Sequence, residues 1–358
     1  MERPSRRRRG AVTIVDVAQA AGVSAMTVSR ALNSGGKISE QTRASVLRVI
    51  EELGYTPNPS ARSLAAGRPN QIGFVYSGIT VAFLKNFLAG AVARARQTDN
   101  QLVVETCDLN DETSQREAAR RMANADVRGV ILTPPISESS PLVEELQRLK
   151  IRFASVAVAN PSDNPLTVRI DHRRAAAEIT RHLVELGHRR IGFIRGNPAY
   201  QSATERELGF RDALKAAGID PAQCPVVQGY YNLESGIAAA ERLVQLQPRP
   251  TAIFASNDDM AAGVIYVAHQ RGIAVPSDLT VVGFDDMETA LIVWPQLTTI
   301  RQPVAQMAAS AIDLLLDDLE KQDQGLAPTT AEIVLDYEFI VRNSSAAPTE
   351  TPAHSTGH

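Results

Sequence analysis

The sequence predicts an α/β protein with a small helical domain at its N-terminus and a larger core of parallel sheets. Two short helical patterns meet at Gly22, and a third follows them. From residue 71 onward, short β-branched runs alternate with helical stretches, as in parallel sheets that are covered on both faces. This alternation continues over about 270 residues, which is more than a single hydrophobic core usually organises. We therefore expect a three-helix helix-turn-helix headpiece, a short helix after it, and then a two-lobed core of doubly wound parallel sheets.

The headpiece is predicted from two helices that are joined at residues 22–24. Both helices can bury one face, because small and branched apolar residues recur at helical spacing: Val17, Ala18, Ala21, Val23, Val28, Ala31 and Leu32. Thr13 and Ser24 precede the two helices, where a side-chain oxygen can accept from free backbone N–H groups. A third helix is expected over 39–53, with Val46, Ile50 and Leu53 facing the other two. The helix-turn-helix domain is assigned to residues 12–56.

Charge separates the N-terminal piece from the remainder of the chain. Residues 1–68 hold 11 Lys and Arg against 5 Asp and Glu, a net charge of +6, and since the whole chain carries −3, residues 69–358 carry −9. This asymmetry places a polyanion partner, expected to be double-stranded DNA, on the N-terminal piece. The basic arm, residues 1–11, contains arginines at 6–9. The arm either contacts DNA or remains a solvated extension, and the sequence leaves both open.

Turn residues and a short helical segment follow the third helix. Pro57 and Pro59 precede residues 60–66, which offer a helix of about two turns that is marginal alone. The segments DVA (16–18), GVS (22–24), TVSRALN (27–33), ELGYTPN (52–58) and SLA (63–65) closely resemble the headpiece of the LacI/GalR family of bacterial transcription regulators. In that family the short helix is a hinge that folds only when two subunits sit on an operator. The resemblance implies such a hinge helix at 57–68.

The resemblance also implies which residues contact DNA. The second helix enters the major groove, where Ala25, Met26 and Arg30 match the positions that read base edges, and the fork of Arg30 suits guanine. Leu64 matches the hinge leucine that wedges into the minor groove, and packing of Leu64 on its own protein is the alternative. Short donors that suit phosphates are Ser24, Thr27, Ser29 and Asn33. The other positions of the predicted DNA-binding set are Thr13, Asn58 and Ala61.

The core is predicted from short β-branched runs with helical stretches between them. Strands are expected at 72–76, 101–105, 129–133, 152–158, 190–194, 251–256 and 279–284, with a last strand at 331–341. Helices are expected at 84–97, 114–124, 173–186, 204–217, 234–246 and 259–271.

This region resembles the periplasmic sugar-binding-protein fold, which is the effector core of the same family, as far as Val341. In that fold the chain crosses between two lobes three times. The resemblance implies a core at 69–342, with the first lobe at about 69–166 and 302–328 and the second at about 167–301 and 329–342. Segment 343–358, rich in Ser, Thr, Pro and Ala, is expected to be a disordered tail.

Ligands of doubly wound sheets lie outside the carboxyl ends of the strands. Candidate groups at these ends are Ser77, Thr133, Asn257 with Asp258, and Asp285 with Asp286. By resemblance, Arg206 in RELGF matches the family's effector arginine, and Tyr231 and Phe83 fall where aromatic residues line the same cleft. The alternatives are turns or helix caps for the strand-end pairs, a surface position for Arg206, and plain packing for the aromatic residues. The predicted effector-binding set is Ser77, Phe83, Thr133, Arg206, Tyr231, Asn257 and Asp285.

Catalytic, metal-binding and membrane patterns are missing from the sequence. It contains no Gly-rich phosphate loop, no H-E-x-x-H and no G-x-S-x-G, so an enzyme is not expected. A satisfied structural role is the default for the histidines of predicted helices, which are His172, His182, His188 and His269. Cys107 and Cys224 are too few and too far apart for a metal site, and His354 with His358 is a weak pair, so no metal or cofactor is expected. Neither a membrane span nor a signal peptide is found, which predicts a cytoplasmic protein.

Together these features predict a sequence-specific DNA-binding transcriptional repressor whose operator affinity is controlled by a small ligand. Arg, Asn and Asp side chains in one cleft suit neighbouring hydroxyl groups, so a sugar or sugar derivative acting as inducer is expected. A corepressor-type regulator that responds to a purine or nucleoside is the alternative, and a sugar-binding or carbohydrate-converting protein without DNA affinity is a second. No leucine heptad follows residue 341, so we expect a homodimer on a quasi-palindromic operator.

Overall fold

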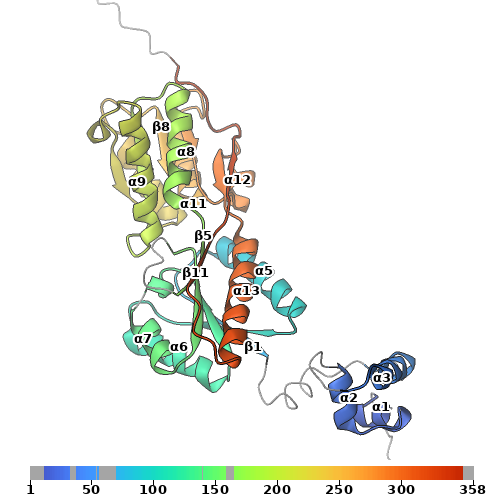
Figure 1. Cartoon of the computed structure of the whole chain (residues 1–358). Coiled ribbons are helices and arrows are strands. Elements are labelled where there is room, and N and C mark those ends of the chain that lie inside the picture. The colour runs from blue at the N-terminus through green and yellow to red at the C-terminus, as the bar shows by residue number, and fades with distance from the viewer. Residues whose placement is uncertain are drawn as a thin grey trace, which may run out of the picture. The chain divides into compact units, whose positions relative to one another are not determined.

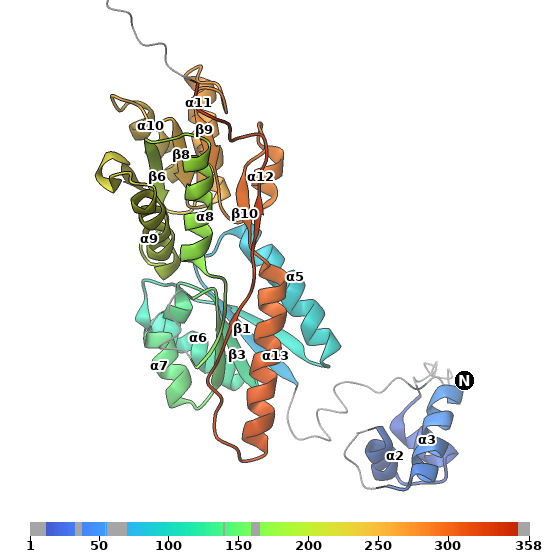
Figure 2. The same ribbon diagram turned by 45° about the horizontal axis from the view of Figure 1, so that its top comes forward.

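The computed structural model describes residues 12–32, 38–53, 55, 70–138, 140–158 and 165–349. The chain forms two compact units, Met1–Asn70 and Gln71–His358, and each is described by itself. Figures 1 and 2 show their elements. As predicted, the first unit is helical and the second is built on parallel sheets. The basic arm at 1–11 and the expected hinge helix at 57–68 lie outside the described residues.

Three helices form the N-terminal unit: α1 (Ile14–Ala20), α2 (Ala25–Leu32) and α3 (Glu40–Leu53). Thr13 caps α1 in a capping box, because its hydroxyl accepts from the Asp16 N–H at 3.4 Å and the Asp16 carboxylate accepts from the Thr13 N–H at 2.8 Å. Gly22, in the turn before α2, has a φ of +68°, which favours glycine. Ser24 caps α2, since its hydroxyl accepts from the Thr27 N–H at 3.2 Å.

The core of this unit joins one face of each helix, and its fully buried residues are Val17, Val28 and Val46. The prediction that Leu53 faces the other helices is wrong, since Leu53 is 39% exposed. Tyr55 is buried in its place. The Tyr55 N–H donates to the Ile50 carbonyl at 3.0 Å, so the chain turns back beneath the end of α3 and carries the tyrosine ring into the core.

The first lobe of the larger unit contains a six-stranded parallel sheet in the order β11-β5-β4-β3-β1-β2. Its strands are β1 (Gln71–Tyr76), β2 (Gln101–Thr106), β3 (Gly129–Leu132), β4 (Arg152–Val156), β5 (Leu166–Arg169) and β11 (Ala331–Val334). Its helices are α5 (Val81–Gln97), α6 (Glu112–Asn124), the 3-10 helix η1 (Ile136–Glu138), α7 (Ser140–Arg148) and α13 (Val304–Asp323). Phe74 packs with Phe87 of α5 on one face of the sheet, and Val75 packs with Met122 of α6 on the other. Figures 1 and 2 show α13 beside α5.

The second lobe contains a four-stranded parallel sheet in the order β7-β6-β8-β9. Its strands are β6 (Ile191–Arg195), β7 (Val226–Gln228), β8 (Ala252–Ala255) and β9 (Thr280–Val282). Its helices are α8 (His172–Glu185), α9 (Gln201–Ala216), the 3-10 helix η3 (Pro221–Gln223), α10 (Leu233–Val244), α11 (Asp258–Gln270) and α12 (Glu288–Ile292). Phe193 packs with Phe210 of α9 on one face, and Ile194 packs with Leu243 of α10 on the other. A separate antiparallel pair joins β10 (Thr299–Arg301) to β12 (Glu338–Ile340).

The chain passes between the two lobes after β5, after β10 and after β11. The strand pairing corrects the expected lobe boundaries, which gave 167–301 and 329–342 to the second lobe. β5 and β11 pair with each other in the first-lobe sheet, so residues 167–169 and 331–334 belong to the first lobe. The last expected strand, 331–341, is two strands in different sheets, because the chain returns to the second lobe between them.

Residues 343–349 do not form the disordered tail that their composition predicts. Ser344 is fully buried, its hydroxyl accepts from the Thr298 N–H at 2.9 Å, and it donates to the Val281 carbonyl. The Ala346 carbonyl lies 2.9 Å from Nε2 of His188. The segment is ordered because backbone groups and side chains of the second lobe supply hydrogen-bond partners for it, which composition alone does not reveal. Residues 350–358 lie outside the described part of the chain.

Candidate DNA-binding helix and effector cleft

The first residues of α2 form the exposed end of the predicted recognition helix. Met26 is 64% exposed, while Ala25 and Thr27 are half-buried and Ser24 and Thr13 are exposed. The hydroxyls of Ser24 and Thr27 lie 2.9 Å apart and share one hydrogen bond. One hydroxyl hydrogen of this pair therefore remains for a phosphate oxygen.

The structure describes the other residues that are predicted to contact DNA only in part or not at all. Ser29 and Arg30 lie within α2, but their side chains are outside the described residues. Positions that lie wholly outside the described residues are Asn33, Asn58, Ala61 and Leu64.

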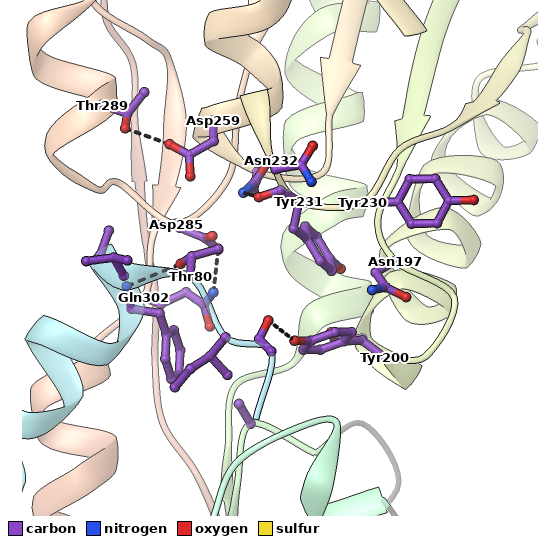
Figure 3. A pocket seen from close by; sticks show the side chains of 18 of the residues that line it. Thr80, Asn197, Tyr200, Tyr230, Tyr231, Asn232, Asp259, Asp285, Thr289 and Gln302 are labelled. Carbon is purple, nitrogen blue, oxygen red and sulfur yellow. Dashed lines mark hydrogen bonds between the residues drawn. The ribbon is translucent and has the colours of Figure 1, made fainter. Parts of the chain in front are cut away.

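A cleft of about 660 Å³ opens between the two lobes of the larger unit (Figure 3). The first lobe contributes the turn after β1 and the start of α5, and the second contributes the ends of its strands and the starts of its helices. The members of the predicted effector set that line the cleft are Phe83, Arg206, Tyr231, Asn257 and Asp285.

The structure does not bring Ser77 and Thr133 to this cleft. Both are buried, Thr133 completely, and neither lines the cleft. Each follows a strand of the first lobe directly, and the chain turns there so that the next residues face the cleft instead. These residues are Gly78, Ile79, Thr80 and Pro134.

Arg206 lies at the buried end of the cleft and is only 4% exposed, so it is not a surface helix residue. Its Nη1 donates to the Ser256 carbonyl, and its Nη2 lies 3.4 Å from Oδ1 of Asp285. The guanidinium carbon lies 3.7 Å from the centre of the Phe284 ring. A buried cation requires such partners, because an unpaired charge is costly in a medium of low polarity.

Asp285 is held beside Arg206 by an unusual backbone and by a second side chain. Its φ is 110°, a conformation that L-residues rarely adopt. Its carboxylate accepts from Nε2 of Gln302 at 2.6 Å, and Figure 3 shows the two side chains together. Burial raises the pKa of Asp285 to about 6, although Arg206 and the Gln302 hydrogen bond oppose that shift. Oε1 of Gln302 has no partner among the described residues and faces the same region.

Asn257 and Tyr231 are coupled to each other. Asn257 caps α11, since its Oδ1 accepts from the Met260 N–H at 3.0 Å, so the helix-cap alternative describes this residue. Its Nδ2 donates to the Tyr231 carbonyl at 3.0 Å, and Tyr231 has a φ of 64°. The Tyr231 ring lies 5.4 Å from the ring of Tyr200 in an edge-on contact. Asn257 therefore fixes the backbone that presents an aromatic ring to the cleft.

The two carboxylates next to these candidates are structural. Asp258 is buried and accepts from the Thr299 hydroxyl at 2.7 Å and from the Met287 N–H at 2.8 Å. Asp286 forms ion pairs with Arg301 at 2.7 Å and with Arg342 at 2.6 Å. Asp258 thus joins the end of β8 to β10 and to the segment after β9, and Asp286 joins the end of β9 to β10 and to the segment after β12.

Hydrogen bonds cross the cleft between the lobes. The Tyr200 hydroxyl donates to the Gly78 carbonyl at 2.7 Å, which Figure 3 shows, and the Gln201 N–H donates to Oε2 of Glu138 at 3.1 Å. Tyr200 is not among the residues that were predicted to bind the effector. The signal that identifies it is its place in the turn after β6, since strand-end turns line the cleft.

Of the histidines expected to be structural, His182 and His188 have partners within the protein, and His269 is exposed. His188 has partners on both ring nitrogens, Thr251 and Ala346, and His182 lies 3.2 Å from the Ser345 hydroxyl. His172 lines the cleft, and neither of its ring nitrogens has a partner among the described residues. The structural role expected for His172 is therefore not found.

Other kinds of site are not formed by the residues that the structure describes. Within 12–32, 38–53, 55, 70–138, 140–158 and 165–349, no group of three or more His, Cys, Asp and Glu is arranged for a metal ion. Over the same ranges, every helix is too short or too polar to cross a membrane. Cys107 and Cys224 are buried free thiols.

A helical headpiece with an exposed recognition helix and a two-lobed core with a polar cleft together define a class of protein, the ligand-responsive DNA-binding regulators. Residues 13–58 match the model for bacterial regulatory proteins of the lacI family, and residues 180–345 match the model for a periplasmic binding protein-like domain. The chain belongs to the LacI family. It is a DNA-binding transcriptional regulator with a ligand-binding core.

Individual relatives cover nearly the whole chain. It is 34% identical to the HTH-type transcriptional regulator DegA of Bacillus subtilis over 336 residues, which span 93% of this chain and 98% of DegA. The structure of the lac repressor dimer bound to operator and the anti-inducer ONPF is similar with a TM-score of 0.74 and 27% identity, over 94% of this chain and all of that one. A complex of the transcriptional regulator CelR with cellobiose is similar with a TM-score of 0.69 and 29% identity, over 93% of this chain and all of that one.

Proposed function

We propose that this chain represses transcription as a homodimer on a quasi-palindromic operator, and that a sugar or sugar derivative that fills the cleft releases it. The observation that carries the proposal is the buried group of Arg206, Asp285 and Gln302 between two lobes, with Tyr231 and Phe83 on the walls. Donors and acceptors of this kind can pair with neighbouring hydroxyls, and each is costly when it is buried without a partner. Aromatic rings suit the apolar faces of a sugar ring. The matched complex of CelR with cellobiose supports a sugar ligand.

The interlobe hydrogen bonds support a mechanism in which the ligand changes the pose of the lobes. The Tyr200–Gly78 and Gln201–Glu138 hydrogen bonds exist in one arrangement of the lobes and break in another. A ligand that contacts both walls of the cleft shifts the equilibrium between these arrangements. In a dimer, that change sets the separation of the two headpieces and hence whether both can engage one operator. Coupling of this kind is usually worth about 1 to 3 kcal/mol.

On the DNA side, we propose that α2 enters the major groove. Arg30 would pair with a guanine, while Ala25 and Met26 contact a thymine methyl or exclude larger groups. Leu64 would wedge into the minor groove at the centre of the operator. The further contacts, to phosphates and the adjoining backbone, come from Thr13, Ser24, Thr27, Ser29, Asn33, Asn58 and Ala61.

The test is a titration of the full chain onto labelled duplexes from the region beside its own coding sequence, at fixed salt, with and without neutral sugars and nucleosides. Tight binding that one sugar weakens is the expected result. Binding that a purine or nucleoside strengthens would replace the inducer by a corepressor. Absence of specific binding to every duplex of that region, with and without each ligand, would contradict operator recognition.

A further inference from the structure

His172 is the first residue of α8 and one of the side chains that line the cleft. It is 3% exposed, and neither Nδ1 nor Nε2 has a hydrogen-bond partner among the described residues. By contrast, both ring nitrogens of the buried His188 have hydrogen-bond partners within the protein. A buried imidazole without partners costs free energy, so its presence beside a ligand cleft calls for a partner that the ligand supplies.

The surroundings of His172 fix the form of its ring. Phe284 packs 6.0 Å away from it, centre to centre, and the Arg206 guanidinium stacks on that same Phe284 ring. Burial lowers the pKa of His172 well below its usual value, and the positive charges of Arg206 and Arg169 lower it further. A neutral imidazole offers one N–H donor and one acceptor nitrogen. A hydroxyl group can serve either nitrogen, because it both donates and accepts.

The charge of the cleft argues against an anionic ligand. The charged residues that line it are Lys85, Arg206, Asp259, Asp285 and Glu288, which is two cations against three carboxylates. Lys85 pairs with Glu288, and Arg206 pairs with Asp285. Among the described residues, the only hydrogen-bond donor to the Asp259 carboxylate is the Thr289 hydroxyl, at 2.7 Å. A phosphate or carboxylate on the ligand would therefore meet no uncommitted cation in this set and an excess of negative charge.

We propose that His172 is a ligand-contacting residue of the cleft, which together with the Arg206, Asp285 and Gln302 group selects an uncharged polyhydroxylated ligand over its phosphorylated and acidic forms. The inference rests on the proposed function, since it takes the cleft as the effector site. It adds a residue to that site and excludes one chemical class of sugar, the anionic derivatives. His172 directly follows the first of the three crossings between the lobes, and Gln302 lies at the second, so a ligand that binds both is also held at the hinge.

The test uses the full chain and isothermal titration calorimetry. The probes are glucose, galactose, xylose, ribose and cellobiose, with glucose 6-phosphate, ribose 5-phosphate and glucuronate as charged counterparts. We expect one neutral sugar to bind and its charged counterparts to bind at least tenfold more weakly. His172→Phe, which keeps the ring and removes both nitrogens, should weaken that sugar at least tenfold. His172→Asn, which keeps one donor and one acceptor, should retain more affinity than His172→Phe.

His182→Phe is the matched control, because His182 lies on the same helix, outside the residues that line the cleft. It should leave the affinity for the sugar unchanged, and the thermal midpoints of the variants without ligand report whether they fold. Tighter binding of a phosphorylated or acidic sugar, no binding by any neutral sugar, or unchanged affinity in a folded His172→Phe protein would overturn the proposal. Operator binding is measured on the same preparations. If the unmodified chain does not bind an operator, the proposed function is contradicted. If it binds the operator and only the His172 prediction fails, the proposed function as a regulator stands.

Discussion

Arg206 and Asp285 face each other at the buried end of the cleft, with Nη2 of the arginine 3.4 Å from Oδ1 of the aspartate. Arg206 comes from α9, and Asp285 follows β9, so two separate elements of the second lobe meet here. The pair is also tied to the connection between the lobes, because Gln302 donates to Asp285. A ligand that binds this group therefore acts on a hinge segment as well as on one lobe.

Replacement of Arg206 by alanine is expected to abolish the ligand response and to leave operator binding intact. The substitution removes the buried donor fork and leaves Asp285 without its cation, so affinity for the ligand should fall at least 100-fold, or by about 3 kcal/mol. Calorimetry measures the affinity for the ligand, and a gel-shift assay measures the affinity for the operator. Arg211→Ala is the control, since Arg211 lies on the same helix and pairs with Glu207 at 2.8 Å, away from the cleft. Equal loss of ligand and operator binding in Arg206→Ala would contradict the separation of the two functions.

Asp285 makes the stability of the core depend on pH. Its pKa is raised from 3.8 to about 6, so the folded state binds more protons than the unfolded state between these values, and this group lowers stability as pH rises through that window. Asp285→Asn removes this titration, so the stability of the variant relative to the parent should rise by up to about 3 kcal/mol between pH 4 and pH 7.5, on top of a pH-independent cost of leaving Arg206 without its carboxylate. Thermal midpoints of the two proteins between pH 3.5 and 8 provide the comparison. A difference in stability that stays constant over that range would show that the effect does not come from this titration.

The bond from Tyr200 to Gly78 joins the two lobes, so its removal should loosen the closed cleft. Tyr200→Phe is expected to weaken ligand binding by about 2- to 10-fold, the range of one neutral hydrogen bond. Tyr266→Phe removes a hydroxyl from the outer part of α11, where it accepts from Gln270 at 2.6 Å, and should leave ligand affinity unchanged. If both variants bind as the parent protein does, the interlobe bond has no part in closure.

Gly209 allows α8 and α9 to approach closely beside the cleft. A Cβ at this position would lie 2.1 Å from the Arg173 carbonyl, which is a backbone atom and cannot rotate away. Gly209→Ala should lower the free energy of unfolding by about 1 to 3 kcal/mol, as overpacking does in other cores. Lys215→Ala, at an exposed position of the same helix, should change it by less than about 0.5 kcal/mol. Denaturant titrations of the three proteins make the comparison, and an unchanged midpoint for Gly209→Ala would contradict the close packing.

The sequence predicts the headpiece and the alternating core well, because both depend on local signals. Thr13 and Asp16 form the capping box that starts α1, and the boundaries of α1 and α2 follow from it and from Gly22. Helix α13 was not assigned, and it begins at Val304 without a side-chain cap. Strands β7 and β10 were not assigned either, and with three residues each they are too short for a period to be seen.

Within the cleft, the sequence pattern found residues whose position follows from a strand end or a motif, such as Arg206 and Asp285. It did not distinguish the residue that directly follows a strand from those one to three positions further on. Ser77 is buried while Gly78 and Thr80 line the cleft, because the direction of a turn depends on tertiary packing. His172 was expected to be structural for a similar reason: whether a buried ring finds partners is decided by residues from distant parts of the chain.

If one ligand in the cleft controls operator affinity, the two binding equilibria must be linked reciprocally, and both sides of that linkage can be measured. Calorimetry would measure the affinity of the sugar for the full chain alone and for its complex with the operator, while operator affinity is measured with and without saturating sugar. Because the coupling is reciprocal, the operator should weaken the sugar by the same factor by which the sugar weakens the operator, about 5- to 150-fold. Equal operator affinity with and without a sugar that demonstrably fills the cleft would contradict control of the operator by the ligand.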